Sequence, residues 1–125
     1  MNIRNLFLIF FVFISTSLFA NSGKDIFDRF CTACHSPSMS PMFGSPALHD
    51  VSAWNERKDN AFNIAVEADA SLKSAVGQQK EEISLKQLVK SAISGTDKGM
   101  PPKGTCNDCT DDDLKTVIKF MSSVE

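Results

Sequence analysis

The first hydrophobic pattern along the chain is an unbroken apolar run from Leu6 to Ile14, preceded by a short segment that contains Arg4. Small polar residues and a Leu-Phe-Ala sequence follow the run, which is typical of a secretion signal. The run is shorter than the roughly 20 apolar residues of a transmembrane helix, so an uncleaved membrane tether is the weaker alternative. We therefore predict a signal peptide over residues 1–20 and one mature domain over residues 21–125.

Three stretches of the mature part repeat apolar residues at the spacing of an amphipathic helix. The first covers residues 24–34 and follows Ser22, which is a good N-cap. The second begins with a capping-box pattern at Ser84 and ends at Gly95. The third begins after Thr110. The expected buried faces are Ile26, Phe27 and Phe30; Leu85, Leu88, Val89, Ala92 and Ile93; and Leu114, Val117, Ile118 and Met121.

The segments between these helices have weaker patterns. Residues 36–46 contain three prolines and one glycine, which predicts a loop and not a helix. Residues 61–76 are weakly amphipathic and are consistent with one or two short helices, and the polar residues 78–82 predict a solvated connector. The sequence therefore predicts an all-α fold with three main helices and several short ones.

Composition and charge narrow the classes of partner. The chain has 15 acidic and 13 basic residues, a formal net charge of −2, and no cluster of Lys or Arg. Loss of residues 1–20 would remove Arg4 and make the domain more acidic. This balance argues against nucleic acid or an anionic membrane as a partner. With one Trp and no Tyr, a domain this small would gain stability from a large flat hydrophobic group at its centre.

Residues 31–35 read Cys-Thr-Ala-Cys-His, which is the spacing that attaches haem c. On a helical turn, the thiols of Cys31 and Cys34 can form thioether links to two vinyl groups of one porphyrin. His35 can then bind the iron as its proximal ligand. Taken alone, the motif leaves two alternatives open: a thioredoxin-like redox pair and half of a zinc site.

A methionine further along the chain is the best candidate for a second axial ligand. Met100 lies in a loop directly before the rigid pair Pro101–Pro102, which would hold a weak thioether–iron bond at fixed geometry. Met39 and Met42 follow the proximal histidine too closely to cross easily to the opposite haem face. We interpret both as surface or gap-filling residues, and His49 as a side chain at a loop-to-helix junction.

Three further residues are candidates for the haem environment. A ligating histidine usually donates its second ring N–H to a carbonyl or carboxylate, and the carbonyl of Pro46 lies in the returning loop. Trp54 and Arg57 are three residues apart on a segment that could be a short helix, so they would share one face. Both side chains only donate hydrogen bonds, which suits haem propionates; a core Trp and a solvated Arg are the alternative.

Cys106 and Cys109 form a second Cys-x-x-Cys pair without a following histidine, so they do not make a second haem motif. A disulfide or a metal pair are the two options. Export favours the disulfide, which would stiffen the loop next to Met100.

In order, these features resemble the small class I cytochromes c, and most closely the cytochrome c5 family. The resemblance covers residues 23–57 and 84–124 and rests on Cys-x-x-Cys-His, Trp-x-x-Arg and the run Met-Pro-Pro-x-Gly-x-Cys-x-x-Cys. It implies a small class I cytochrome c fold whose helices wrap around one covalently attached haem. The chain departs from the family by roughly 15–20 additional residues between Arg57 and Met100, judged from usual connection lengths.

The resemblance also implies a role for each candidate residue. Cys31 and Cys34 would bind haem covalently, and His35 and Met100 would be the axial ligands of its iron. Pro46, Trp54, Arg57 and Pro101 would belong to the haem environment, and Cys106 and Cys109 would form a disulfide.

The function implied by the resemblance is one-electron transfer in the periplasm by an electron carrier that is not an enzyme. Its partners would be redox proteins such as a membrane cytochrome complex and a terminal oxidase or reductase. We expect a monomer that meets the membrane only transiently or through an uncleaved N-terminus. Two other hypotheses are a haem catalyst or gas sensor in which Met100 does not bind the iron, and a haem-free dithiol oxidoreductase. A dedicated subunit or donor of one respiratory complex is also compatible with the sequence.

Overall fold

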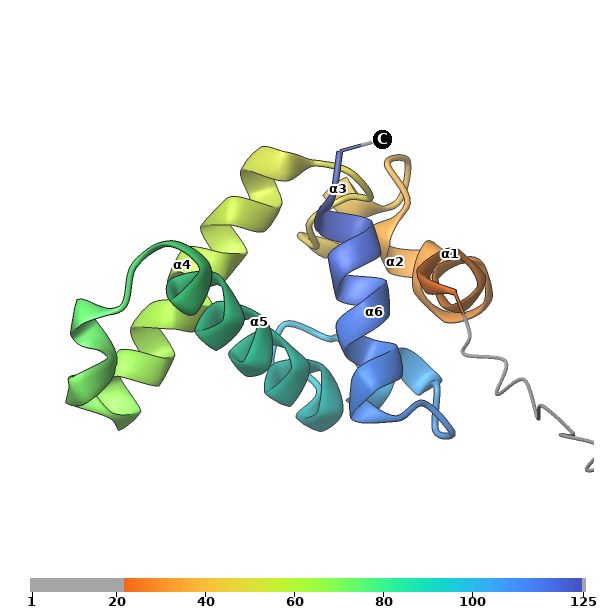
Figure 1. Ribbon diagram of the computed structural model, residues 1–125. Coiled ribbons are helices and arrows are strands. Elements are labelled where there is room, and N and C mark those ends of the chain that lie inside the picture. The colour runs from red at the N-terminus through yellow and green to blue at the C-terminus, as the bar shows by residue number, and fades with distance from the viewer. Residues whose placement is uncertain (1–21, 125) are drawn as a thin grey trace, which may run out of the picture.

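The computed structural model describes residues 22–124, and every regular element in that range is helical, as the sequence predicts (Figure 1). The predicted signal peptide over residues 1–20 lies outside the described residues. Among the helices of the described part, none is both long and apolar enough to cross a membrane.

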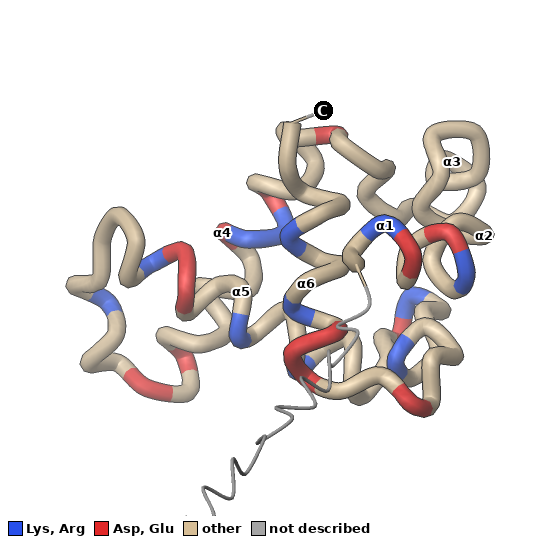
Figure 2. The backbone as a smooth tube through the Cα atoms, turned by 45° about the vertical axis from the view of Figure 1, so that its right-hand side comes forward, with Lys and Arg blue, Asp and Glu red and all other residues tan. Residues whose placement is uncertain are grey.

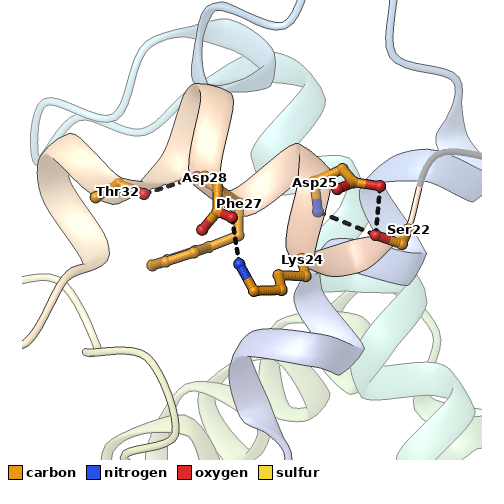
Figure 3. Close-up of polar contacts among 6 residues, drawn as sticks. All are labelled: Ser22, Lys24, Asp25, Phe27, Asp28 and Thr32. Atoms are coloured by element: carbon orange, nitrogen blue, oxygen red, sulfur yellow. Dashed lines mark hydrogen bonds and ion pairs between the residues drawn. The ribbon is translucent and has the colours of Figure 1, made fainter.

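The segment that leads into the Cys-x-x-Cys-His motif is helical from Gly23 to His35. It consists of α1 (Gly23–Ile26), a π-helical stretch η1 (Phe27–Cys31) and α2 (Thr32–His35). Ser22 caps it as predicted, because its hydroxyl accepts a hydrogen bond from the Asp25 amide at 3.1 Å (Figure 3). The Thr32 hydroxyl donates to the Phe27 carbonyl at 3.0 Å, five residues earlier, where the helix is wider.

The prediction of a loop over residues 36–46 is wrong in part. A short helix, α3 (Ser40–Phe43), lies within it, with Pro41 in its first turn. Proline is tolerated there because the first amides of a helix have no intrahelical partner. Gly44 then ends the helix in the left-handed conformation, with φ of 60°.

Residues 51–94 form two long helices, which the sequence analysis underestimated. α4 (Val51–Ala68) is a single helix of 18 residues, and the Asp50 carboxylate accepts from the Ala53 amide at its start. A 3₁₀ turn, η2 (Ala70–Ser74), leads to α5 (Gly77–Ser94). The polar residues 78–82, predicted as a connector, are therefore the first turns of α5.

Ser84 does not cap α5, contrary to the capping-box prediction. It is buried inside the helix, and its hydroxyl donates to the Lys80 carbonyl at 2.9 Å. The polar turn before it is stabilised by packing against α4, with ion pairs Lys58–Glu81 at 2.6 Å and Lys80–Asp59 at 2.8 Å. The predicted end at Gly95 is confirmed.

After the tight turn η3 (Pro102–Thr105), the chain ends in α6 (Asp111–Ser122). Thr110 begins α6 with a complete capping box, in which its hydroxyl accepts from the Asp113 amide and the Asp113 carboxylate accepts from the Thr110 amide. Figure 1 shows α6 between α1 and α5, and it packs against both. The buried core combines α1, α4, α5 and α6: Ile26, Phe27, Trp54, Leu85, Val89, Ala92, Leu114, Val117, Ile118 and Met121, with Cys106 and Cys109. The predicted buried faces are thus confirmed, with Phe30, Leu88 and Ile93 partly buried at the edge of the core.

Basic and acidic residues are interspersed along the described chain, with a short acidic run at the start of α6 (Figure 2). Within residues 22–124, four ion pairs join residues of opposite charge: Lys24–Asp28, Lys58–Glu81, Lys80–Asp59 and Lys115–Glu82. The fold therefore does not gather the basic residues of this part into a strongly positive surface.

The helices α1 and α6 approach each other closely at Gly23. A Cβ atom there would lie 2.6 Å from the Cβ of Phe120 and 3.0 Å from the Thr116 carbonyl oxygen. Neither atom is the flexible end of a side chain, so the two helices can pack at this distance only because residue 23 is glycine.

We therefore predict that Gly23→Ala destabilises the fold. Overpacking costs about 1–3 kcal/mol, which outweighs the gain of about 0.5–1 kcal/mol expected for alanine over glycine in a helix. The midpoint of chemical denaturation should fall accordingly. Lys24→Ala, at an exposed position of the same helix, is the control and should change stability by at most about 0.5 kcal/mol. An unchanged midpoint for Gly23→Ala would show that α1 can move away from α6 without cost.

Candidate haem-binding site

A cavity of about 340 Å³ lies between the Cys-x-x-Cys-His motif, α4, α5 and the loop after α5. Most of the sequence-predicted site residues line it: Cys34, His35, Pro46, Trp54, Arg57 and Met100. Cys31 and Pro101 are not among its lining residues. The fold thus brings residues separated by 66 positions in the sequence, Cys34 and Met100, to one cavity.

Both cysteines of the motif are free thiols and are partly buried. Burial raises the pKa of the Cys31 thiol to about 11, and the neighbouring Cys34 adds to the effect. Redox-active Cys-x-x-Cys pairs work through a thiolate with a lowered pKa. The environment of Cys31 therefore does not suit a dithiol oxidoreductase.

The imidazole of His35 is buried and held in one orientation. Its Nδ1 lies 2.8 Å from the carbonyl oxygen of Pro46, the contact that the sequence analysis anticipated. A carbonyl can only accept, so Nδ1 carries the proton and the neutral ring keeps a free lone pair on Nε2. Burial lowers the pKa of His35 and the positive charge of Arg57 lowers it further, although the Pro46 carbonyl opposes both. The neutral ring is the form that binds a metal.

Trp54 and Arg57 share one face of α4, and both donate to backbone carbonyls of the 44–48 loop. The Trp54 Nε1 donates to the Ala47 carbonyl at 2.8 Å, and the Arg57 Nη2 donates to the Gly44 carbonyl at 2.8 Å. An indole has one donor, and here the Trp54 N–H donates to the backbone. The expected place of both residues near the haem propionates stays a prediction. The sequence could not identify these acceptors because they depend on how the 44–48 loop folds against α4.

Met100 is held through its backbone. Thr96 provides both contacts: its amide donates to the Met100 carbonyl at 2.9 Å, and its hydroxyl accepts from the Met100 amide at 3.3 Å. At Gly95, where φ is 76°, a Cβ atom would lie 2.7 Å from the same Met100 carbonyl oxygen and 3.0 Å from the Pro102 nitrogen. The end of α5 and the Met100 loop are therefore in direct backbone contact.

Cys106 and Cys109 lie close together directly after this loop. Their Sγ atoms are paired, their Cα atoms are 5.4 Å apart, and both residues are buried. The Lys103 ammonium donates to the Cys109 carbonyl at 2.8 Å across the turn. No cluster of three or more His, Cys, Asp or Glu side chains that could hold a metal ion occurs within residues 22–124. Within these residues, therefore, no further His, Cys, Asp or Glu ligand completes a metal site at Cys106 and Cys109 or a zinc site at Cys31 and Cys34.

The histidine and the two methionines that the sequence analysis weighed besides His35 and Met100 lie outside the cavity. The Nδ1 of His49 is 2.7 Å from the Ser123 carbonyl, and its amide donates to the Met121 carbonyl, so this residue is tied to the end of α6. Met42 is 75% exposed and Met39 is partly buried. None of these three side chains lines the cavity.

Several cavity residues were not recognised from the sequence. Ala61 and Ile64 come from the second half of α4, in a region where we had identified no chemistry, and Leu88, Ser91 and Ala92 come from α5. The spacing of apolar residues predicted the α5 helix, but it did not show which residues of that helix line the cavity. The lining of the cavity is largely apolar.

These residues fit a haem. The Cys-x-x-Cys pair offers two thiols, His35 a neutral imidazole nitrogen and Met100 a thioether, and apolar walls suit a flat porphyrin. A haem alone explains why these thiol, imidazole and thioether groups lie around one apolar cavity.

Comparisons with known proteins agree with this assignment. A family model described as cytochrome c oxidase, cbb3-type, subunit III matches residues 19–121. Cytochrome c5 of Ectopseudomonas mendocina is 34% identical over 105 residues, which cover 84% of this chain and 92% of that protein. Cytochrome c5 of Azotobacter vinelandii is also 34% identical over 105 residues, covering 84% of this chain and 96% of that protein. No solved structure matches the chain significantly.

The matches extend over the Cys-x-x-Cys-His motif, the cavity walls and the Met100 loop. The hypothesis of a haem-free dithiol oxidoreductase is therefore wrong, as the environment of Cys31 also indicates. The chain belongs to the cytochrome c family, with cytochromes c5 among its relatives, and its cofactor is covalently bound haem c.

Proposed function

We propose that this protein is a periplasmic one-electron carrier in which His35 and Met100 are the axial ligands of the haem iron. One observation supports it above the others: His35, with its tautomer fixed by Pro46, and Met100, with its backbone fixed by Thr96, line the same apolar cavity beside Cys34. A carrier needs ligands that stay in place when the iron changes oxidation state, and both side chains come from constrained backbone.

The bound haem supplies the electron that is transferred. The chain provides attachment, ligation and environment. In the proposed site the Cys31 and Cys34 thiols would hold the haem covalently, each through a thioether bond to one of its vinyl groups. His35 would bind the iron through Nε2, because Nδ1 donates to Pro46. A methionine sulfur and an apolar cavity both favour the reduced iron and so raise the reduction potential.

Export is the second part of the proposal. The N-terminal pattern supports a signal peptide over residues 1–20 and a haem domain over residues 21–125. Two Cys-x-x-Cys pairs suit an oxidising compartment if one pair carries haem and the other, Cys106 and Cys109, forms a disulfide. The partners would be redox proteins such as a membrane cytochrome complex and a terminal oxidase or reductase. The protein would bind them as a monomer.

The mass of the mature protein tests attachment, cleavage and oxidation together. Produced in a periplasm with haem-maturation machinery, the protein should have the mass of residues 21–125 plus one haem, less the two hydrogens lost in the Cys106–Cys109 disulfide. Intact mass spectrometry resolves each contribution. A mass that includes residues 1–20 would show an uncleaved anchor, and a mass without haem would contradict the proposed carrier.

The substitution Met100→Ala tests the sixth ligand. The haem should remain attached, but the reduction potential should fall by roughly 0.1–0.3 V, a part of the ≈ 0.8 V range that axial ligands span. The near-infrared charge-transfer band of a ferric His/Met haem should disappear, and carbon monoxide should bind quickly to the ferrous form. Met42→Ala, which removes an exposed methionine outside the cavity, is the control. An unchanged potential for Met100→Ala would favour the open-site haem catalyst or gas sensor.

The double substitution Cys106→Ala with Cys109→Ala tests the role of the second pair. Releasing so short a loop should lower the free energy of unfolding by about 2 kcal/mol. Denaturant titration of the haem protein measures the loss, and the near-infrared band should persist because neither cysteine is a ligand. Complete loss of haem from this variant would mean that the pair has a direct part in haem binding.

A further inference from the structure

Residues 44–48, which we call the proximal loop, are hydrogen-bonded to the haem-attachment motif at three places. The His35 Nδ1 donates to the Pro46 carbonyl, and the Leu48 amide donates to the His35 carbonyl at 2.7 Å. The Ser45 hydroxyl donates to the Cys34 carbonyl. The position of the Pro46 carbonyl, and with it the orientation of the His35 ring, therefore depends on the proximal loop as a whole.

α4 holds the other side of the proximal loop. Arg57 donates to the Gly44 carbonyl at 2.8 Å and Trp54 donates to the Ala47 carbonyl at 2.8 Å, so the two bonds lie on either side of Pro46 in the sequence. Trp54 and Arg57 are three residues apart, about one helical turn. One face of α4 thus anchors the backbone on both sides of the carbonyl that orients His35.

Trp54 also contacts His35 directly. The indole and imidazole rings are stacked, with centroids 5.8 Å apart and an interplanar angle of 21°. Trp54 is only 4% exposed, so its N–H···O bond to Ala47 is shielded from competing water. Of the two anchors, Trp54 is therefore the one that acts on both the ring and the proximal loop.

We propose that Trp54 is a positioning residue for the proximal ligand and tunes the reduction potential of the haem through the proximal loop. This inference rests on the proposed function, because it requires His35 to bind the iron. The Pro46 carbonyl polarises the Nδ1–H bond and makes the opposite nitrogen, Nε2, a stronger electron donor. A stronger donor stabilises ferric iron. A looser proximal loop weakens that hydrogen bond, favours ferrous iron and raises the potential.

Trp54→Phe in the mature haem protein isolates this effect. Phenylalanine keeps an aromatic ring against His35 but lacks the N–H that binds Ala47. We expect the ferrous-to-ferric ratio at a fixed ambient potential to rise about threefold, which is roughly 30 mV for a one-electron couple. The Nδ1–H proton of His35, observed by NMR in the reduced protein, should shift and exchange faster with solvent. Spectroelectrochemistry measures the potential.

The matched control is Phe62→Leu, which removes an aromatic ring from the same helix. Phe62 packs beneath the Lys80 ammonium and does not line the cavity. The Phe62→Leu substitution should lower the stability of the fold without changing the reduction potential of the haem or the Nδ1–H resonance of His35. Should Trp54→Phe fail to fold, Arg57→Gln removes the anchor at Gly44 instead, and the Nδ1–H proton of His35 should again shift and exchange faster. The potential is not the readout for this variant, because the substitution also removes a positive charge that lines the cavity and would by itself lower the potential.

The outcomes separate the two proposals. If wild-type protein shows the near-infrared band, and Trp54→Phe leaves both the potential and the Nδ1–H resonance of His35 unchanged, Trp54 is only a core residue and the inference is overturned. If wild-type protein lacks the band, the His/Met ligation of the proposed function fails, whereas a shift of both readouts in Trp54→Phe would still support the inference, which requires only that His35 binds the iron. A shift in both readouts for Trp54→Phe that is absent from Phe62→Leu supports it.

Discussion

The hydrogen bond between the His35 ring and the Pro46 carbonyl is the contact on which the rest of the site depends. It fixes which nitrogen carries the proton and so which one is available to iron. The carbonyl is in place because the proximal loop is bound on one side to residues 34 and 35 and on the other to α4. Three parts of the fold, α2, the proximal loop and α4, therefore contribute to the geometry of one side chain.

The elements that the sequence predicted well are those specified by neighbouring residues. Ser22 and Thr110 cap their helices as expected, because a cap is a hydrogen bond to an amide three residues away. α4 and the first half of α5 were missed for the opposite reason. Their polar turns are stabilised by each other, through pairs such as Lys58–Glu81 that lie more than 20 residues apart. At Ser84 a local capping pattern was present, but tertiary packing determined where the helix begins.

The candidate site shows the same division. The residue types of a haem ligand set, and the Pro46 carbonyl as partner of the proximal histidine, could be inferred from spacing and chemistry along the chain. The acceptors of Trp54 and Arg57 could not, because a donor side chain reveals what it can bind and not which acceptor the fold will bring to it. The sequence also did not predict that Ala61 and Ile64 line the cavity. They do so because α4 extends to Ala68, and tertiary contacts determine that length.

The backbone contact at Gly95 has a consequence for which changes the chain can tolerate. Because any side chain there would collide with the Met100 carbonyl and with Pro102, the helix end and the following loop behave as one rigid unit. A shift of α5 would carry Met100 with it. Asp97 and Lys98 are exposed and also line the cavity, so changes at these two positions would alter the charge beside the cofactor, whereas Gly99, with φ of 102°, has a backbone conformation that favours glycine. The protein could thus acquire a new surface beside its cofactor while the position of the sulfur stays the same.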